Sequence, residues 1–153
     1  PNIANLVLIT NSETVLDYGC GKGNQYIESH LNILFHIKDE NIYMYDPCFS
    51  EHSKLPKRKF DGVISTDVME HIPEEIVPKA LDTIYSKAKK FVYLAICTRL
   101  AHAILPNGEN AHCTVKEPDW WEKHIIKSNK NKIHTEVHWY GNHNDYRKYY
   151  TSS

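Results

Sequence analysis

Apolar runs and segments of helical periodicity alternate along most of the chain. Short runs typical of buried strands cover residues 13–18, 41–45, 60–66 and 91–97. Apolar residues recur at helical spacing over residues 24–34 and 73–90. Pro78 fits the first turn of a helix better than its interior, and the run 91–97 is apolar throughout, as in a strand covered on both faces. Strands that alternate with helices predict a parallel, doubly wound α/β sheet.

The last third of the chain has a different pattern. A long polar connection over residues 98–117 precedes a helical segment at 118–128. Strand-like runs at 133–140 and 146–151 then flank a Gly-Asn-His-Asn-Asp sequence, which is strong turn chemistry. We therefore expect one domain over residues 1–153 whose sheet is mostly parallel and closes with a C-terminal antiparallel hairpin.

The composition is that of an ordinary globular domain. The 153 residues are 41% hydrophobic and 24% charged, which is enough to bury one core. The 18 Lys and Arg against 19 Asp and Glu give a net charge of -1, so no basic field gathers polyanions and nucleic acid is disfavoured as a partner. No apolar run approaches the roughly 20 residues that span a bilayer, and no charged segment precedes an apolar one at the N-terminus. We expect a soluble, cytoplasmic protein without membrane contact.

The residues that commonly bind metals are dispersed. The four cysteines form no Cys-x-x-Cys pair: Cys20, Cys48, Cys97 and Cys113. This spacing favours reduced thiols over a zinc site or a disulfide framework. His134 and His138 share one face of a predicted strand, but no carboxylate or cysteine stands beside them, so an exposed strand face is the preferred interpretation. The sequence predicts no metal site.

A glycine-rich turn follows the first predicted strand. The strand ends near Asp17, and the chain turns through Gly19, Gly21 and Gly23 into a helix. Glycines leave bare backbone beside any ligand at that helix N-terminus. The dinucleotide pattern Gly-x-Gly-x-x-Gly fails because residue 24 is Asn, which disfavours a nicotinamide enzyme.

These residues carry a family resemblance. The run Val15-Leu16-Asp17-x-Gly19-Cys20-Gly21-x-Gly23 resembles the first motif of class I S-adenosylmethionine-dependent methyltransferases. Asp46, after the second strand, resembles the acid that binds the cofactor ribose, and the block 60–73 resembles the fourth-strand block. The resemblance spans residues 15–97 and implies a Rossmann-like fold with S-adenosyl-L-methionine as cofactor. Residues 13–97 would form the cofactor half and residues 98–153 the substrate side.

The resemblance also implies roles for individual residues. The glycine loop would line the methionine end of the cofactor with Asp17, Gly19, Cys20, Gly21 and Gly23. Asp46 would hold the ribose, and Pro47 would lie near the adenine. Ser65, Thr66 and Asp67, at the carboxyl end of the next strand, would approach the amino-acid moiety and the reacting methyl.

The sequence departs from the family pattern in two places. Between Asp46 and Phe60 there is no room for the usual helix and third strand, so the fold is reduced after the second strand and the acid that often reads the adenine amino group is missing. The glycine loop also begins close to residue 1, so we expect no helices of the kind that commonly cover the substrate. A second subunit in a homodimer, or the segment 99–117, would then cover the site.

Candidates for chemistry follow the third and fourth predicted strands. His71, His112 and Asp67 are candidate catalytic residues, since a histidine near neutral pKa can take a proton from the acceptor. Arg99, Asn110 and His112 lie in a long polar connection where the methyl acceptor is expected, and are candidate substrate-binding residues. His71 could instead pack against or cap the turn before Pro73. At least one of the two tryptophans at 120 and 121 is expected in the core.

The main hypothesis is methyl transfer to an oxygen or nitrogen of a small molecule. Two alternatives stay open: a methyltransferase-like binding module without turnover, and an enzyme that consumes S-adenosylmethionine by cleavage. Asp46-Pro47-Cys48-Phe49 is superficially similar to an element of DNA amino-methyltransferases. It follows the wrong strand, which disfavours that activity.

Overall fold

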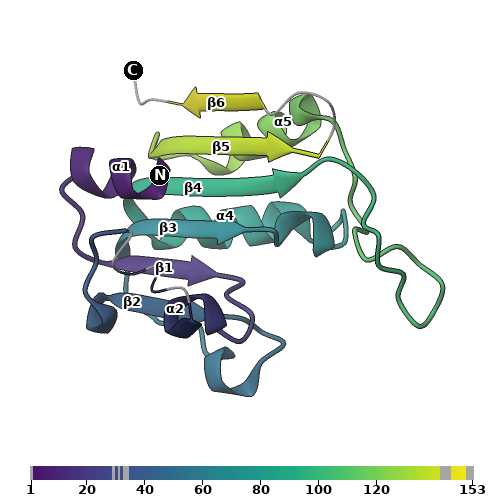
Figure 1. Ribbon diagram of the computed structural model, residues 1–153. Helices are drawn as coiled ribbons and strands as arrows, with labels where there is room; N and C mark the ends of the chain where they lie inside the picture. The colour runs from purple at the N-terminus through teal and green to yellow at the C-terminus, as the bar shows by residue number, and fades with distance from the viewer. Residues whose placement is uncertain (1, 29, 31, 33–34, 142–145, 151–153) are drawn as a thin grey trace.

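A single six-stranded sheet organises the computed structural model, which describes residues 2–28, 30, 32, 35–141 and 146–150. Its strands are β1 (Val15–Tyr18), β2 (Ile42–Tyr45), β3 (Phe60–Thr66), β4 (Ala88–Cys97), β5 (His134–Tyr140) and β6 (Tyr146–Tyr150), in the spatial order β2-β1-β3-β4-β5-β6. The first five strands are parallel, which confirms the predicted α/β class (Figure 1). β6 pairs antiparallel with β5 at the edge, with Thr135 opposite Tyr150, while most of the predicted turn lies outside the described residues.

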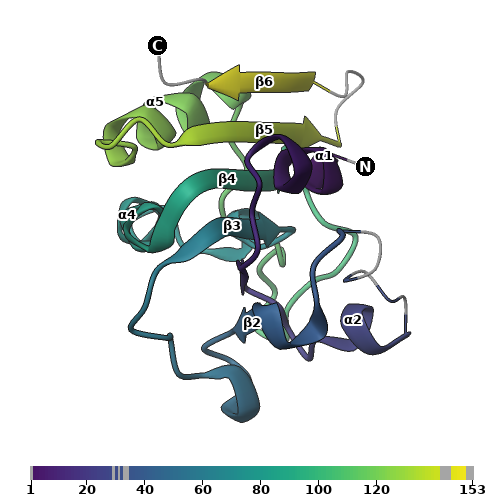
Figure 2. The ribbon, with the colours of Figure 1, turned by 90° about the vertical axis from the view of Figure 1, so that its left-hand side faces the viewer.

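Helices cover both faces of the sheet. They are α1 (Asn2–Ile9), α2 (Asn24–Glu28), α4 (Val77–Lys87) and α5 (Pro118–Ser128), with short 3-10 turns η1 (Asp39–Asn41), η2 (Ser50–His52) and η3 (Met69–His71). α4 and α5 lie on one face, and α1 lies on the other (Figure 2). Among the described residues, none of the helices combines the length and the apolar character that crossing a membrane requires.

β4 is apolar at successive positions because both of its faces are buried. Val92, Leu94 and Ile96 belong to the cluster formed with α4 and α5. The intervening Phe91 and Tyr93 belong to the cluster formed with α1. Successive side chains of a strand point to opposite faces, so a strand between two helical layers needs no polar positions.

Local patterns set most element bounds correctly. The helix predicted at 118–128 has these bounds, and α4 begins with Pro78 in its first turn. Of the helix predicted at 24–34, α2 forms Asn24–Glu28, and several later positions lie outside the described residues.

The helix predicted over residues 73–90 was wrong at both ends. Its first four residues form a turn before α4, and its last three residues belong to β4. Ala88 pairs with Phe60 on β3, and a register irregularity beside this pair leaves Lys89 and Lys90 exposed. Sheet pairing therefore outweighs the helical preference of an Ala-Lys-Lys run.

The sequence pattern predicts no element before residue 13, but α1 lies there and is part of the core. Ile3, Leu6 and Val7 are buried against β1, β3 and β4. α1 therefore forms the second layer of the fold.

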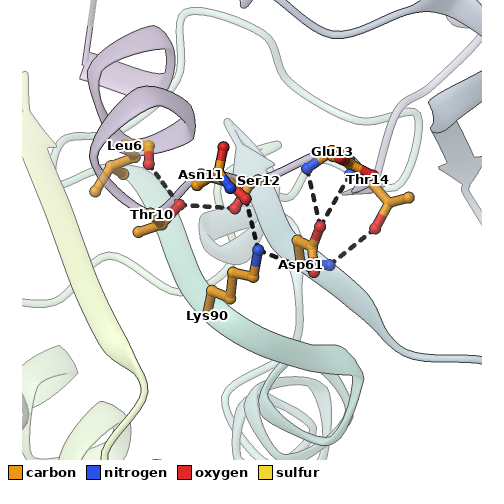
Figure 3. A network of polar contacts seen from close by, with 8 residues as sticks. All are labelled: Leu6, Thr10, Asn11, Ser12, Glu13, Thr14, Asp61 and Lys90. Carbon is orange, nitrogen blue, oxygen red and sulfur yellow. Dashed lines mark hydrogen bonds and ion pairs between the residues drawn. The ribbon is translucent and has the colours of Figure 1, made fainter.

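A polar network fixes the chain between α1 and β1 (Figure 3). Asp61 accepts hydrogen bonds from the backbone N–H groups of Glu13 at 2.9 Å and Thr14 at 3.4 Å, and its carboxylate lies 3.6 Å from the ammonium of Lys90. Lys90 also donates to the carbonyl of Asn11 at 2.6 Å. Partial burial opposes the charged form of Asp61, but these N–H groups and Lys90 hold its pKa below the usual value. The network ties the start of β1 to β3 and β4.

The carboxyl ends of the parallel strands meet at one edge of the sheet. The loops after β1, β2, β3 and β4 all leave from this edge, on the right of Figure 1. Ligands bind at such edges in open α/β sheets. β2 is an outer strand of this sheet, and only η2 interrupts the loop between it and β3, as the short predicted connection requires.

Candidate functional site

The loop after β1 is held by backbone hydrogen bonds to β2. The carbonyl of Tyr45 accepts the N–H of Gly19 at 2.7 Å and that of Cys20 at 3.2 Å. The N–H of Gly23 closes the turn on the carbonyl of Cys20 at 3.1 Å. The loop is therefore fixed before any ligand is present.

Two glycines of this loop are required for different reasons. Gly19 has a φ of +87°, and a Cβ there would lie 2.3 Å from a methyl of Val68, in the segment after β3. Gly21 has a φ of +59°, and a Cβ there would meet nothing within 4 Å. Gly19 therefore allows the loop to approach the segment after β3, and Gly21 presents bare backbone toward open space.

Asp17 is a buried carboxylate beneath the loop. It accepts hydrogen bonds from the Tyr26 hydroxyl at 2.6 Å and from the Gln25 amide at 3.3 Å. Burial raises its pKa to about 6, against the opposing effect of these two hydrogen bonds. A carboxylate kept at this desolvation cost is expected at a functional site.

Asp46 lies directly across from the loop, at the end of β2. One of its carboxylate oxygens accepts the N–H of Gly21 at 2.9 Å, and the other accepts the N–H of Cys48 at 2.8 Å. Each oxygen keeps a second lone pair. Pro47 and Cys48 are exposed beside it. The structure thus brings together the predicted Asp17, Gly19, Cys20, Gly21 and Asp46, and Gly23 is buried at the start of α2.

The segment after β3 forms the other side of this edge. Ser65 is buried, and its hydroxyl oxygen has no hydrogen-bond partner among the described residues. Thr66 is half-buried, and Asp67 is exposed with a φ of +58°. Asp67 accepts a hydrogen bond from the hydroxyl of Tyr140, which reaches from the end of β5. A left-handed, non-glycine residue beside a ligand-binding edge is typical of a functional segment.

The two candidate histidines are neighbours. The rings of His71, in η3, and His112, in the long connection, pack edge to face with centroids 4.7 Å apart. His71 Nδ1 bonds to the carbonyl of Ala111 at 2.8 Å, and His112 Nδ1 bonds to the carbonyl of Arg99 at 2.6 Å. A carbonyl only accepts, so both Nδ1 atoms carry hydrogen and each neutral ring keeps its lone pair on Nε2. Both rings can therefore accept a proton at Nε2.

The long connection after β4 contains a small hairpin that projects beyond the strand edge (Figure 1). Asn110 holds it: its amide oxygen accepts the N–H groups of Ala101 and His112, and its amide nitrogen donates to the Ala101 carbonyl, all at 2.9 Å. Arg99 is exposed at the base of the hairpin. Asn110 therefore positions His112, and all three hydrogen bonds of its amide go to backbone groups of the same connection.

Four residues of this edge were not among the predicted site residues. Gln25 and Tyr26 donate hydrogen bonds to Asp17, and Tyr140 donates one to Asp67. The fourth residue, Glu70, is fully buried beside His71. None of the four had a local signal in the sequence. The first three depend on contacts between separate elements.

The two tryptophans of α5 differ in burial, as expected. Trp121 is fully buried in the core, and Trp120 is half-buried and packs against His124, with ring centroids 4.2 Å apart. The prediction of one core tryptophan is confirmed.

Comparison with known proteins agrees with the geometry of the edge. A family model described as a methyltransferase domain matches residues 2–151. No curated protein matches the chain. The match covers nearly the whole sequence, including the glycine loop and the two acids beside it. The chain belongs to the methyltransferase domain family, which is consistent with the class I resemblance.

Proposed function

We propose that the protein uses S-adenosyl-L-methionine to methylate an oxygen or nitrogen of a small molecule. The supporting observation is the pair of carboxylates, Asp17 and Asp46, on the two sides of a rigid glycine loop. When bound, the cofactor supplies a methyl group already activated by its sulfonium.

The residues at the strand edge fit this cofactor. Asp46 is fixed by the backbone of Gly21 and Cys48 and retains acceptor capacity for two neighbouring hydroxyls, as a ribose presents. Asp17 offers negative charge near the methionine end, where the cofactor carries a sulfonium and an ammonium. Gly21 leaves room that a side chain would fill.

The chain's contribution to the chemistry is mainly orientation. Methyl transfer needs an aligned acceptor and a dry site, and alignment supplies roughly 7–11 kcal/mol. The hairpin held by Asn110 projects beyond the edge, and we expect it to order the acceptor. His71 and His112 can accept the proton that a hydroxyl acceptor loses, which contributes on the order of 10²–10⁴ in rate.

Calorimetric titration with S-adenosylmethionine and with its demethylated product tests the cofactor site. The parent should bind both saturably, and Asp46→Ala should weaken binding by roughly 1.5–3 kcal/mol, the value of hydrogen bonds to a charged group. Asp82→Ala, at an exposed position on α4, is the matched control and should bind like the parent. No binding to the folded parent would exclude the proposed cofactor.

Product analysis separates methyl transfer from the alternatives. With labelled cofactor and a panel of hydroxyl and amine acceptors, label should move to an acceptor. Binding without any turnover favours a binding module, and acceptor-independent breakdown favours a cleaving enzyme. Alanine at Arg99, Asn110 and His112 should lower transfer; unchanged rates in all three would remove the argument that the hairpin forms the acceptor site.

A further inference from the structure

We propose that Glu70, Cys97 and His112 form a binding site for a divalent transition-metal ion, with zinc as the best-fitting ion. One ligand atom from each of these three side chains lies within 4.8 Å of the other two. The group lies outside the glycine loop and the two acids that bracket it.

Three separate segments supply the ligands. Glu70 belongs to η3, directly after β3; Cys97 is the last residue of β4; and His112 ends the projecting hairpin. The adjacent strands β3 and β4 place the first two side by side, and the hairpin returns the third onto them. The site is therefore built by the fold rather than by a local motif.

The state of Glu70 indicates a missing positive partner. Its side chain is fully buried, one oxygen accepts the N–H of Cys97 at 3.1 Å, and the other oxygen has no hydrogen-bond partner among the described residues. A buried carboxylate oxygen without a partner is costly, and buried charges are normally paired or bound to metal.

The surroundings of His112 and Cys97 are those of ligands held in place. The Nδ1–H of His112 donates to the carbonyl of Arg99, the kind of outer hydrogen bond that orients metal-binding imidazoles and fixes their tautomer. Cys97 is buried, and a Cβ on Gly141 would lie 3.0 Å from its sulfur, so this glycine makes room for the thiol. Neither side chain would have to leave the loop or strand that carries it.

The ligand set selects the ion. Sulfur, imidazole nitrogen and carboxylate oxygen together suit zinc, whereas magnesium and calcium prefer oxygen alone. Tetrahedral zinc bonds of about 2.0–2.3 Å separate ligand atoms by roughly 3.3–3.8 Å, so closure from the present distances requires side-chain movements of about one ångström. Three protein ligands leave the fourth position to water. With the metal bound, His112 Nε2 is a ligand, and His71 is the remaining proton acceptor of the pair. If the proposed function holds, this position can receive an acceptor oxygen and lower its pKa; metal binding itself does not depend on that function.

Direct metal binding, measured without S-adenosylmethionine, tests the site. The chain, stripped with a chelator, is titrated with Co²⁺ as a spectroscopic probe, and a second stripped sample is dialysed against Zn²⁺ to count the bound ions. We expect one ion per chain and a thiolate-to-cobalt charge-transfer band. Cys97→Ser should abolish the band, and Glu70→Gln and His112→Asn should weaken binding by more than the roughly 10–100-fold that loss of an outer-shell partner causes.

Matched variants keep the test decisive. Cys113→Ser removes an exposed thiol, and His102→Asn removes an exposed imidazole from the same connection; both should bind like the parent. Circular dichroism verifies that each variant is folded, and Glu70→Gln keeps the oxygen that accepts the Cys97 N–H. Absence of saturable binding by the parent, or full binding by folded Cys97→Ser, would overturn the proposal. Because the assay contains no cofactor, either result stands apart from the cofactor titration.

Discussion

At the scale of single residues, Asp17 shows a conflict between stability and function. Its carboxylate is buried and its pKa is raised to about 6 by desolvation, although Tyr26 and Gln25 donate to it. The native state therefore binds a proton more readily than the unfolded chain between about pH 4 and pH 6. The contribution of Asp17 to the free energy of unfolding falls as pH rises through this window.

Asp17→Asn should remove this pH dependence. A neutral amide resembles the protonated carboxyl, so the variant should match the parent near pH 4 and exceed its free energy of unfolding by on the order of 2–3 kcal/mol at pH 7. Urea denaturation from pH 4 to pH 7 measures the difference, with the exposed Asp82→Asn as control. A variant less stable than the parent at pH 7 would contradict the buried-charge argument. Cofactor binding by Asp17→Asn should weaken at the same time.

Gly19 and Gly21 give a matched pair of alanine substitutions. Gly19→Ala combines a left-handed backbone with a methyl 2.3 Å from the stiff side chain of Val68, and should cost about 2–5 kcal/mol. Gly21→Ala carries the backbone cost alone, about 1–2 kcal/mol, because a methyl there meets nothing within 4 Å. Thermal denaturation ranks the two. Equal losses would show that the loop does not press against Val68.

At the scale of elements, the connection after β4 is ordered by one side chain. Asn110 bonds the backbone of Ala101 and His112 from both ends of its amide. In the part of the chain that the structure describes, the side chain of Asn107, at the hairpin tip, bonds only Glu109. The position of His112 therefore depends on Asn110 far more than on the tip.

Asn110→Ala should loosen the hairpin without unfolding the domain. Hydrogen exchange of the amides of Ala101 and His112 should accelerate, while the global free energy of unfolding changes by less than about 1.5 kcal/mol because the connection is largely exposed. Hydrogen-exchange mass spectrometry of the segment provides the readout, with Asn107→Ala as control. A similar exchange rate in both variants would show that Asn110 is not the clamp. Loss of His112 alignment should lower transfer by as much as about 100-fold.

At the scale of the whole molecule, the sheet is stable only with both faces covered. α4 and α5 bury one face, and α1 buries Phe91, Tyr93 and Ala95 on the other. The carboxyl edge is left to the loops that carry the site. Packing and function are thus separated in space.

Leu6→Ala tests whether α1 is an integral layer. Leu6 is 1% exposed, and its truncation should cost about 2–5 kcal/mol of the free energy of unfolding. Leu8, on the same helix and 63% exposed, is the control. Leu8→Ala should change the free energy of unfolding by less than about 0.5 kcal/mol. Denaturant midpoints give both values. Equal effects would mean that α1 does not pack as described.

The sequence alone determined the features that depend on neighbours along the chain. Short apolar runs indicated the strands β1 to β5, and apolar residues at helical spacing indicated α5. The glycine loop was equally local, because glycine adopts positive φ angles at little cost. The candidate cofactor-binding residues Asp17 and Asp46 followed from the family resemblance, which places them at strand ends.

Only the tertiary structure decided which distant residues meet. Ala88 became a strand residue through pairing with Phe60, and Tyr140 reached Asp67 because β5 lies beside β4. Glu70, Cys97 and His112 have no metal-binding spacing, yet strand order and the return of the hairpin bring them together. Such contacts are set by register and chain crossings, which residue periodicity does not encode.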